Sequence, residues 1–132
     1  MEAAFQQRED CIRQYMQGWL CQNEVRLLTV LSSEVHIIES YGPEYVGTSE
    51  VQQWFHAWHA HGQVLRWDAL HFLHQGAETM VKWFFECRYN DNVDGFDGLS
   101  LVRFDDHGRI AVMEEYQSKS IHHRPYAEAA NP

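Results

Sequence analysis

The stretch Gly98–Ser120, GLSLVRFDDHGRIAVMEEYQSKS, decides the fold of this chain. Two runs of alternating apolar and polar residues flank the tripeptide DHG at 106–108, a combination that predicts a β-hairpin closed by a tight turn. In the first run apolar side chains occupy odd positions, Leu99 and Leu101, and also even positions, Val102 and Phe104. Because successive side chains of a strand point to opposite faces, both faces of this sheet need a cover.

Two longer runs of alternation precede this hairpin. Residues 63–74 and 79–89 are joined by QGAE, and with the hairpin they predict a meander of three or four antiparallel strands. Strict alternation places Trp67 and His71 on one face of the first run. In the second run one face carries Val81, Trp83, Phe85, Cys87 and Tyr89. A further strand, Val35–Ser40, is predicted from its β-branched residues and from the Gly-Pro pair that follows.

Three helices are predicted ahead of the meander. Over residues 2–20 apolar side chains recur at helical spacing, and Asn23 is a candidate N-cap for a short second helix. The third helix, residues 49–62, has the clearest helical period, carried by Val51, Trp54, Phe55 and Trp58. His56 and His59 lie on the opposite face, which we expect to be solvated and not a metal site.

The order of elements indicates an α+β fold, in which three N-terminal helices pack on one face of a strongly bent, mainly antiparallel sheet. The length fits a single domain, 1–132, in which the segment 121–132 has no clear period and is expected to be a C-terminal tail. No helix remains to cover the second face of the sheet. We therefore expect a homodimer that forms through this outer sheet face.

Composition excludes several classes of partner. Ten Lys and Arg against 19 Asp and Glu give a net charge of −9, and without any basic run a nucleic-acid surface is not expected. The three cysteines are odd in number and lack C-x-x-C spacing, which favours free thiols in a reducing compartment over disulfides or a zinc site. No apolar stretch is long enough for a membrane span, and the N-terminal residues do not resemble a signal peptide. We expect a cytoplasmic protein.

The order of elements and several motifs resemble the nuclear-transport-factor-two-like (NTF2-like) superfamily, in particular its SnoaL-like branch, which is related to ketosteroid isomerases. The motifs are QY in the first helix, ESYGPEYVG after the first strand, the Trp-rich third helix and DGFDGLSLVRFDDHGRIAVMEEYQSK. The resemblance covers residues 3–126. It implies a cone-shaped, cystatin-like barrel, with the curved sheet wrapped around the helices and a deep apolar pocket, commonly dimeric. Because this fold hosts isomerases, cyclases, dehydratases, hydrolases and non-catalytic binders, function has to be argued from the site.

The resemblance also identifies candidate catalytic residues. Ketosteroid isomerases use an Asp base at the end of the first strand, together with a Tyr and a neutral Asp that stabilise an oxyanion. Tyr15 matches that Tyr, but Ser40 stands at the base position and Ser100 at the neutral-acid position, so an isomerase of that type is not expected. Glu39 is a candidate acid or base beside the base position. If Ser40 faces the pocket, strict alternation turns the neighbouring Glu39 to the other face of the strand, unless a bulge interrupts the strand end.

The last strand supplies a second candidate carboxyl group. Glu114 and Glu115 are consecutive, so one of them must face inward, and the resemblance favours Met113, Glu115 and Gln117 as the inward set. A carboxyl group in an apolar pocket has a raised pKa, which suits a general acid or base near neutral pH. The alternative is a buried Glu that is simply paired with a Tyr, His or Arg.

Aromatic residues make up 14% of the chain, and many are predicted to point into the space between helices and sheet. They either fill the core or line a pocket that selects a flat, largely apolar ligand. The candidate ligand-binding residues are Trp19, Tyr41, Trp54, Trp58, Trp67, His71, Trp83, Phe85, Asp97, Ser100, Gln117 and His122.

The acidic and amide-rich stretch Asn90–Ser100, NDNVDGFDGLS, has part of the calcium-loop spacing, but Leu101 stands where a bidentate Glu is required. We interpret it as a turn whose two Asp-Gly pairs let the sheet reverse and bend. Asp97 reaches the pocket rim only if a bulge at one of these glycines turns it inward.

Three functions remain open from the sequence. The first is a SnoaL-like small-molecule enzyme that acts by proton transfer on an apolar substrate, with Tyr15 as hydrogen-bond donor, Glu115 or Glu39 as acid or base, and no cofactor or metal. The second is a non-catalytic module that binds a small apolar molecule in the same pocket. The third is a dimeric interaction domain with a filled core.

Overall fold

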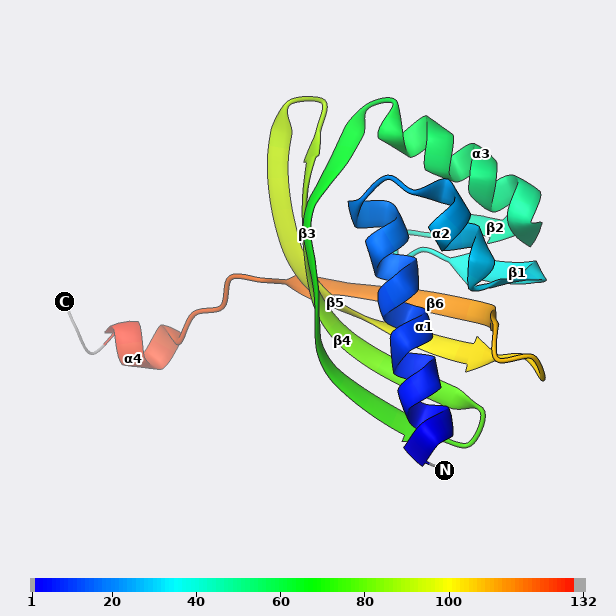
Figure 1. Ribbon diagram of the computed structural model, residues 1–132. Helices are drawn as coiled ribbons and strands as arrows, with labels where there is room; N and C mark the ends of the chain where they lie inside the picture. The colour runs from blue at the N-terminus through cyan, green and yellow to red at the C-terminus, as the bar shows by residue number, and fades with distance from the viewer. Residues whose placement is uncertain (1, 130–132) are drawn as a thin grey trace.

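The computed structural model describes residues 2–129, which contain four helices (Figure 1). The Asn23 side chain accepts a hydrogen bond from the Arg26 backbone N–H at 3.1 Å, which confirms the predicted N-cap. The helices are α1 (Glu2–Leu20), α2 (Glu24–Thr29), α3 (Gly47–His59) and α4 (Pro125–Ala129). Within residues 2–129, none of them combines the length and apolarity that crossing a bilayer requires. Of the predicted tail 121–132, residues 130–132 lie outside the described range.

Six strands of the described chain form one sheet in the order β2-β1-β6-β5-β4-β3. Only β1 and β6 pair in parallel, and the other neighbours are antiparallel. The short strand β2 was not predicted. The strands are β1 (Leu31–Ile38), β2 (Glu44–Val46), β3 (Gly62–Gln75), β4 (Glu78–Tyr89), β5 (Asn92–Phe104) and β6 (Ile110–Lys119).

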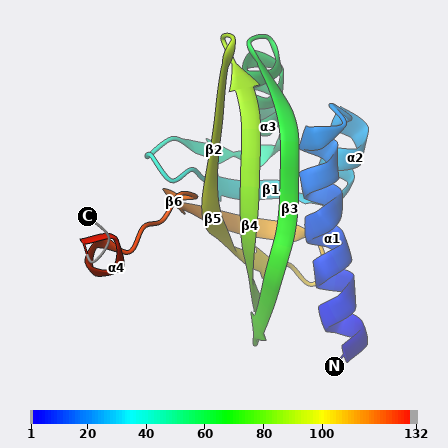
Figure 2. The same cartoon turned by 90° about the vertical axis from the view of Figure 1, so that its left-hand side faces the viewer.

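The sheet curves around α1, α2 and α3, which all lie on its inner side (Figures 1 and 2). Apolar side chains from the helices and from the inner sheet face bury one another in a single core, which includes Ile12, Met16, Leu27, Val35, Val81, Val102 and Met113. This arrangement confirms the predicted α+β architecture. The segment after β6, including α4, leads away from the body of the domain (Figure 1).

The hairpin between β4 and β5 corrects one expectation. The chain reverses at Asn90 and Asp91, which both have positive φ, 48° and 68°, as a tight hairpin turn requires. The two Asp-Gly pairs lie inside β5 and take no part in this reversal. Pairing of β4 with β5 is continuous from Glu78 to Tyr89, without a bulge.

Candidate functional site

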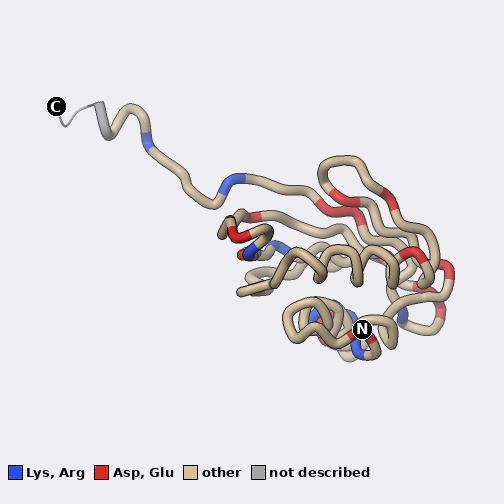
Figure 3. The backbone as a smooth tube through the Cα atoms, turned by 90° about the horizontal axis from the view of Figure 1, so that it is seen from above, with Lys and Arg blue, Asp and Glu red and all other residues tan. Residues whose placement is uncertain are grey.

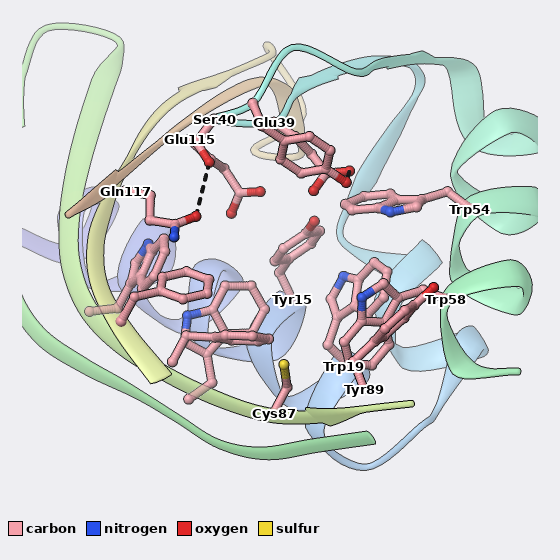
Figure 4. A pocket seen from close by; sticks show the side chains of 15 residues that line it. Tyr15, Trp19, Glu39, Ser40, Trp54, Trp58, Cys87, Tyr89, Glu115 and Gln117 are labelled. Carbon is pink, nitrogen blue, oxygen red and sulfur yellow. Dashed lines mark hydrogen bonds between the residues drawn. The ribbon is translucent and has the colours of Figure 1, made fainter. Parts of the chain in front are cut away.

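A cavity of about 240 Å³ opens between the helices and the concave face of the sheet. Figure 4 shows the 15 side chains that line it, of which ten are aromatic. All five tryptophans of the protein are among them, so the tryptophan-rich segments of the sequence converge on one place. The aromatic lining comprises Tyr15, Trp19, Tyr41, Trp54, Trp58, Trp67, Trp83, Phe85, Tyr89 and Phe96. The remaining lining residues are Glu39, Ser40, Cys87, Glu115 and Gln117.

Tyr15 lies at the centre of this cavity. It is 1% exposed, yet its hydroxyl group has no hydrogen-bond partner among the described residues. The same holds for Nε1 of Trp19 and Nε1 of Trp67, which also line the cavity. Buried donors are rarely left unpaired, so three of them around one cavity indicate that a ligand or ordered water accepts their hydrogen bonds. Burial, and then the charge of Glu115, raise the pKa of Tyr15 by more than the nearby Trp19 indole lowers it, which keeps Tyr15 a neutral donor.

Glu115 faces the cavity from β6, and Met113 and Gln117 share its face, as predicted. Its carboxyl group accepts a hydrogen bond from the Ser100 hydroxyl at 3.4 Å, and Ser100 in turn accepts one from Trp83 Nε1 at 2.9 Å. Ser100 therefore supports Glu115 from behind and does not line the cavity itself. Burial, followed by the charge of Glu39, raises the pKa of Glu115 to about 8. At neutral pH this carboxyl group is mainly protonated and can donate a proton.

Glu39 also faces the cavity. This corrects the expectation that alternation, counted from Ser40, would turn Glu39 to the other face. The inward residues of β1 include Val35 and Ile37, both 0% exposed, and Glu39 continues their alternation without any bulge at the strand end. Its Oε1 accepts hydrogen bonds from the hydroxyl of Tyr45 at 2.8 Å and from that of Tyr41 at 3.2 Å. Burial raises the pKa of Glu39, and the two phenolic donors oppose that rise because they stabilise the carboxylate.

The two carboxyl groups flank the Tyr15 hydroxyl, as Figure 4 shows. Above them, Ser40 donates a hydrogen bond to Gln117 at 3.3 Å and closes part of the rim (Figure 4). Tyr41 is 70% exposed and forms the outer edge of the opening.

Besides Ser100, three predicted ligand-binding residues lie outside the cavity lining. The pairing of β3 with β4 shifts between Ala69 and His71, and this bulge turns His71 to the exposed outer face. The continuous pairing of β5 leaves Asp97 on the outer face as well. His122 lies beside it, with Nε2 3.7 Å from the Asp97 carboxylate. His71, Asp97 and His122 are therefore not part of the cavity.

His59 is also placed differently from the expectation of a solvated side chain. It stacks on Trp19 with ring centroids 5.2 Å apart. Its ring nitrogens lie 2.8 Å from the Phe55 carbonyl oxygen and 3.2 Å from the Trp19 carbonyl oxygen. His59 therefore supports the wall of the cavity from behind, while His56 remains at the surface beside Glu24.

Sequence reasoning missed four residues of the site. Cys87 and Tyr89 share the face of Trp83 in the predicted strand, so alternation alone could have added them. Phe96 points to the same face of its strand as Ser100, so the same rule could have identified it. Tyr45 carried no such signal, because it reaches Glu39 only through the unpredicted pairing of β2 with β1.

Comparison with known proteins agrees with this fold. The family model of the SnoaL-like domain matches residues 12–113, most of the chain. The protein belongs to the SnoaL-like family. No curated protein matches the sequence.

Several solved structures share the fold of this SnoaL-like domain at low identity. A protein of Catenulispora acidiphila with a ketosteroid isomerase-like fold, in complex with trimethylamine, is 13% identical, with 82% of this chain and 85% of that chain covered and a TM-score of 0.73. An LEH-like epoxide hydrolase of M. tuberculosis is 10% identical, with 86% and 84% covered and a TM-score of 0.76. A polyketide cyclase-like protein of Xanthomonas campestris is 13% identical, with 95% and 96% covered and a TM-score of 0.71. At such identities these structures show the NTF2-like fold alone.

Proposed function

We propose that this SnoaL-like domain is a small-molecule enzyme that moves a proton on an apolar substrate enclosed in the aromatic cavity. The observation that carries the proposal is the arrangement of Glu39 and Glu115 around the unpartnered hydroxyl of Tyr15. Burial raises the pKa of both carboxyl groups, and two phenolic hydrogen bonds oppose that rise at Glu39. Such a pair supplies a base and an acid at the same pH.

The proposed roles follow from these environments. In its carboxylate form, which the hydrogen bonds from Tyr41 and Tyr45 stabilise, Glu39 takes a proton from a substrate carbon next to a carbonyl group. Negative charge then develops on the carbonyl oxygen, where the O–H groups of Tyr15 and protonated Glu115 donate hydrogen bonds. Return of the proton at another atom completes an isomerisation, and both carboxyl groups end in their starting states. No cofactor takes part in this scheme.

Proton exchange tests the proposal whatever the final product of the reaction is. Enolisable ketones that carry an aromatic or other apolar group are incubated with the protein in D₂O, and exchange at the carbon next to the carbonyl is followed by NMR. We expect Glu39→Gln and Glu115→Gln each to slow enzyme-dependent exchange by about 10²–10⁴-fold. Glu114→Gln, one residue away on the outer face, is the matched control and should keep full activity. Exchange that is unaffected by both cavity substitutions refutes the proposed roles.

A non-catalytic binder is the second candidate, favoured by the number of aromatic rings that enclose the cavity. It predicts that ligands bind with a measurable affinity and that no exchange exceeds the background rate for any of them. The same NMR samples distinguish the two functions, because bound but unexchanged ligand indicates binding alone.

We further propose that the protein is a homodimer formed through the outer sheet face. Large side chains on this face remain accessible, including Leu73 at 52% and Tyr116 at 53% exposed. Large apolar side chains left exposed on a sheet face are candidates for an interaction site. Basic residues are too few to suggest a nucleic-acid partner, and acidic positions are spread over several segments of the backbone (Figure 3).

A further inference from the structure

One wall of the cavity is a corner of three indole rings. Trp19 lies 4.6 Å from Trp54 with the ring planes tilted by 58°, and 5.8 Å from Trp58 with the planes at 86°. The three rings therefore do not stack on one another, and all three line the cavity, while His59 stacks on Trp19. Tyr45 stacks on Trp54 at 4.3 Å from outside and holds that ring in place.

The carboxyl group of Glu39 lies next to this corner, as Figure 4 shows for Trp54. Both phenolic hydrogen bonds, from Tyr41 and from Tyr45, go to Oε1. Among the described residues, Oε2 has no partner in a hydrogen bond or ion pair. One oxygen of a partly buried carboxylate is therefore left for a ligand, beside three electron-rich ring faces.

The charge of the lining points to the sign of that ligand. Two carboxyl groups and no Lys, Arg or His line the cavity within residues 2–129. An anionic ligand would meet Glu39 without any compensating cation, at a high cost in desolvation. A cation would gain both from the carboxylate and from the ring quadrupoles, and aromatic cages of this kind are suited to quaternary ammonium groups.

We propose that the cavity recognises a small organic cation, with a quaternary ammonium group that lies beside the Glu39 carboxylate and the rings of Trp19, Trp54 and Trp58 and, having no N–H, leaves Oε2 able to accept a proton. This inference rests on the proposed function and refines its substrate from an apolar molecule to one that also carries a cationic group. Away from this corner the cavity offers donors without a partner in residues 2–129, the Tyr15 hydroxyl at its centre and Trp67 Nε1. These donors suit a hydrogen-bond acceptor, such as a carbonyl oxygen, at the far end of the same ligand.

Binding of cations and of their uncharged isosteres tests the inference directly. The probes are tetramethylammonium, choline and benzyltrimethylammonium, each compared with the analogue in which carbon replaces the charged nitrogen, for example 3,3-dimethylbutan-1-ol for choline. Quenching of tryptophan fluorescence reports occupancy, because all five tryptophans line the cavity. We expect at least one cation to bind at least about tenfold more tightly than its isostere.

Substitutions then locate the cation. Glu39→Gln and Trp54→Leu should each remove most of the preference for the cation, and Glu114→Gln should leave it unchanged. Urea unfolding confirms that each variant is folded, and Trp54→Phe replaces Trp54→Leu if that variant is not. Equal or weaker binding of every cation, or a preference that survives Glu39→Gln, overturns the inference. If neutral ketones still exchange protons in a Glu115-dependent manner in that case, the proposed function stands and only the substrate class is wrong.

Discussion

Replacing Glu115 with Gln should change how the stability of the protein depends on pH. The native carboxyl group has a pKa of about 8, raised from 4.5 mainly by burial. Between these two pKa values the carboxyl group of Glu115 keeps its proton in the folded state and loses it in the unfolded state. Since the native state binds more protons in this range, the free energy of unfolding must fall as pH rises, and the contribution of Glu115 is lost progressively up to about pH 8.

The magnitude follows from the size of the shift. One pKa unit corresponds to about 1.4 kcal/mol, so between about pH 5 and about pH 9 Glu115 lowers the free energy of unfolding by about 4 kcal/mol. Water in the cavity next to the carboxyl group would reduce the desolvation, which makes this value an upper limit. Gln keeps the shape and cannot ionise, so Glu115→Gln should remove this part of the pH dependence.

Urea unfolding of the wild type and of Glu115→Gln at about pH 5, 7 and 9 measures the effect. The other titrating groups are common to both proteins and cancel in the difference. We expect the stability of Glu115→Gln relative to wild type to rise by at least about 2 kcal/mol from pH 5 to pH 9. Glu114→Gln is the control, because that neighbour bonds only the Tyr116 hydroxyl on the outer face. A difference that stays constant with pH would refute the buried, protonated state of Glu115.

Three further predictions concern the cavity and the sheet. Tyr15→Phe removes a buried hydroxyl that has no protein partner within residues 2–129, so in the absence of ligand the free energy of unfolding should stay equal or rise by up to about 1 kcal/mol. A loss of stability measured by urea unfolding would show that the hydroxyl is already paired. Gly98→Ala should lower the free energy of unfolding by at least about 2 kcal/mol, because a Cβ there would overlap the Trp83 ring. Gly76→Asn serves as the control at an open left-handed position, and equal unfolding midpoints would contradict this tight contact. Sedimentation should show a dimer that Tyr116→Asp converts to a monomer, and a monomeric wild type at micromolar concentration would contradict the proposed interface.

The predicted elements were largely confirmed because their signals are local. Helical spacing over residues 2–20 and alternation over residues 79–89 reflect the geometry of single elements, and each element is long enough to display its period. Alternation required that one of Glu114 and Glu115 face inward, and the family resemblance selected Glu115. His71 was misplaced because one extra residue in β3 reverses the parity of everything beyond it, and nothing in the local sequence marks that bulge.

The sequence by itself determined that this chain folds as helices on a bent sheet and that its five tryptophans belong to the inner side, whereas only the structure turned Glu39 toward the cavity. Only the tertiary structure decided that these side chains leave a cavity instead of filling the core, since a void depends on how three helices seat on the curved sheet. The tertiary structure also placed Tyr45 against Glu39, residues whose partnership requires β2 to pair with β1. Burial by many distant residues sets the pKa of Glu115, so that property belongs to the folded chain and not to any stretch of its sequence.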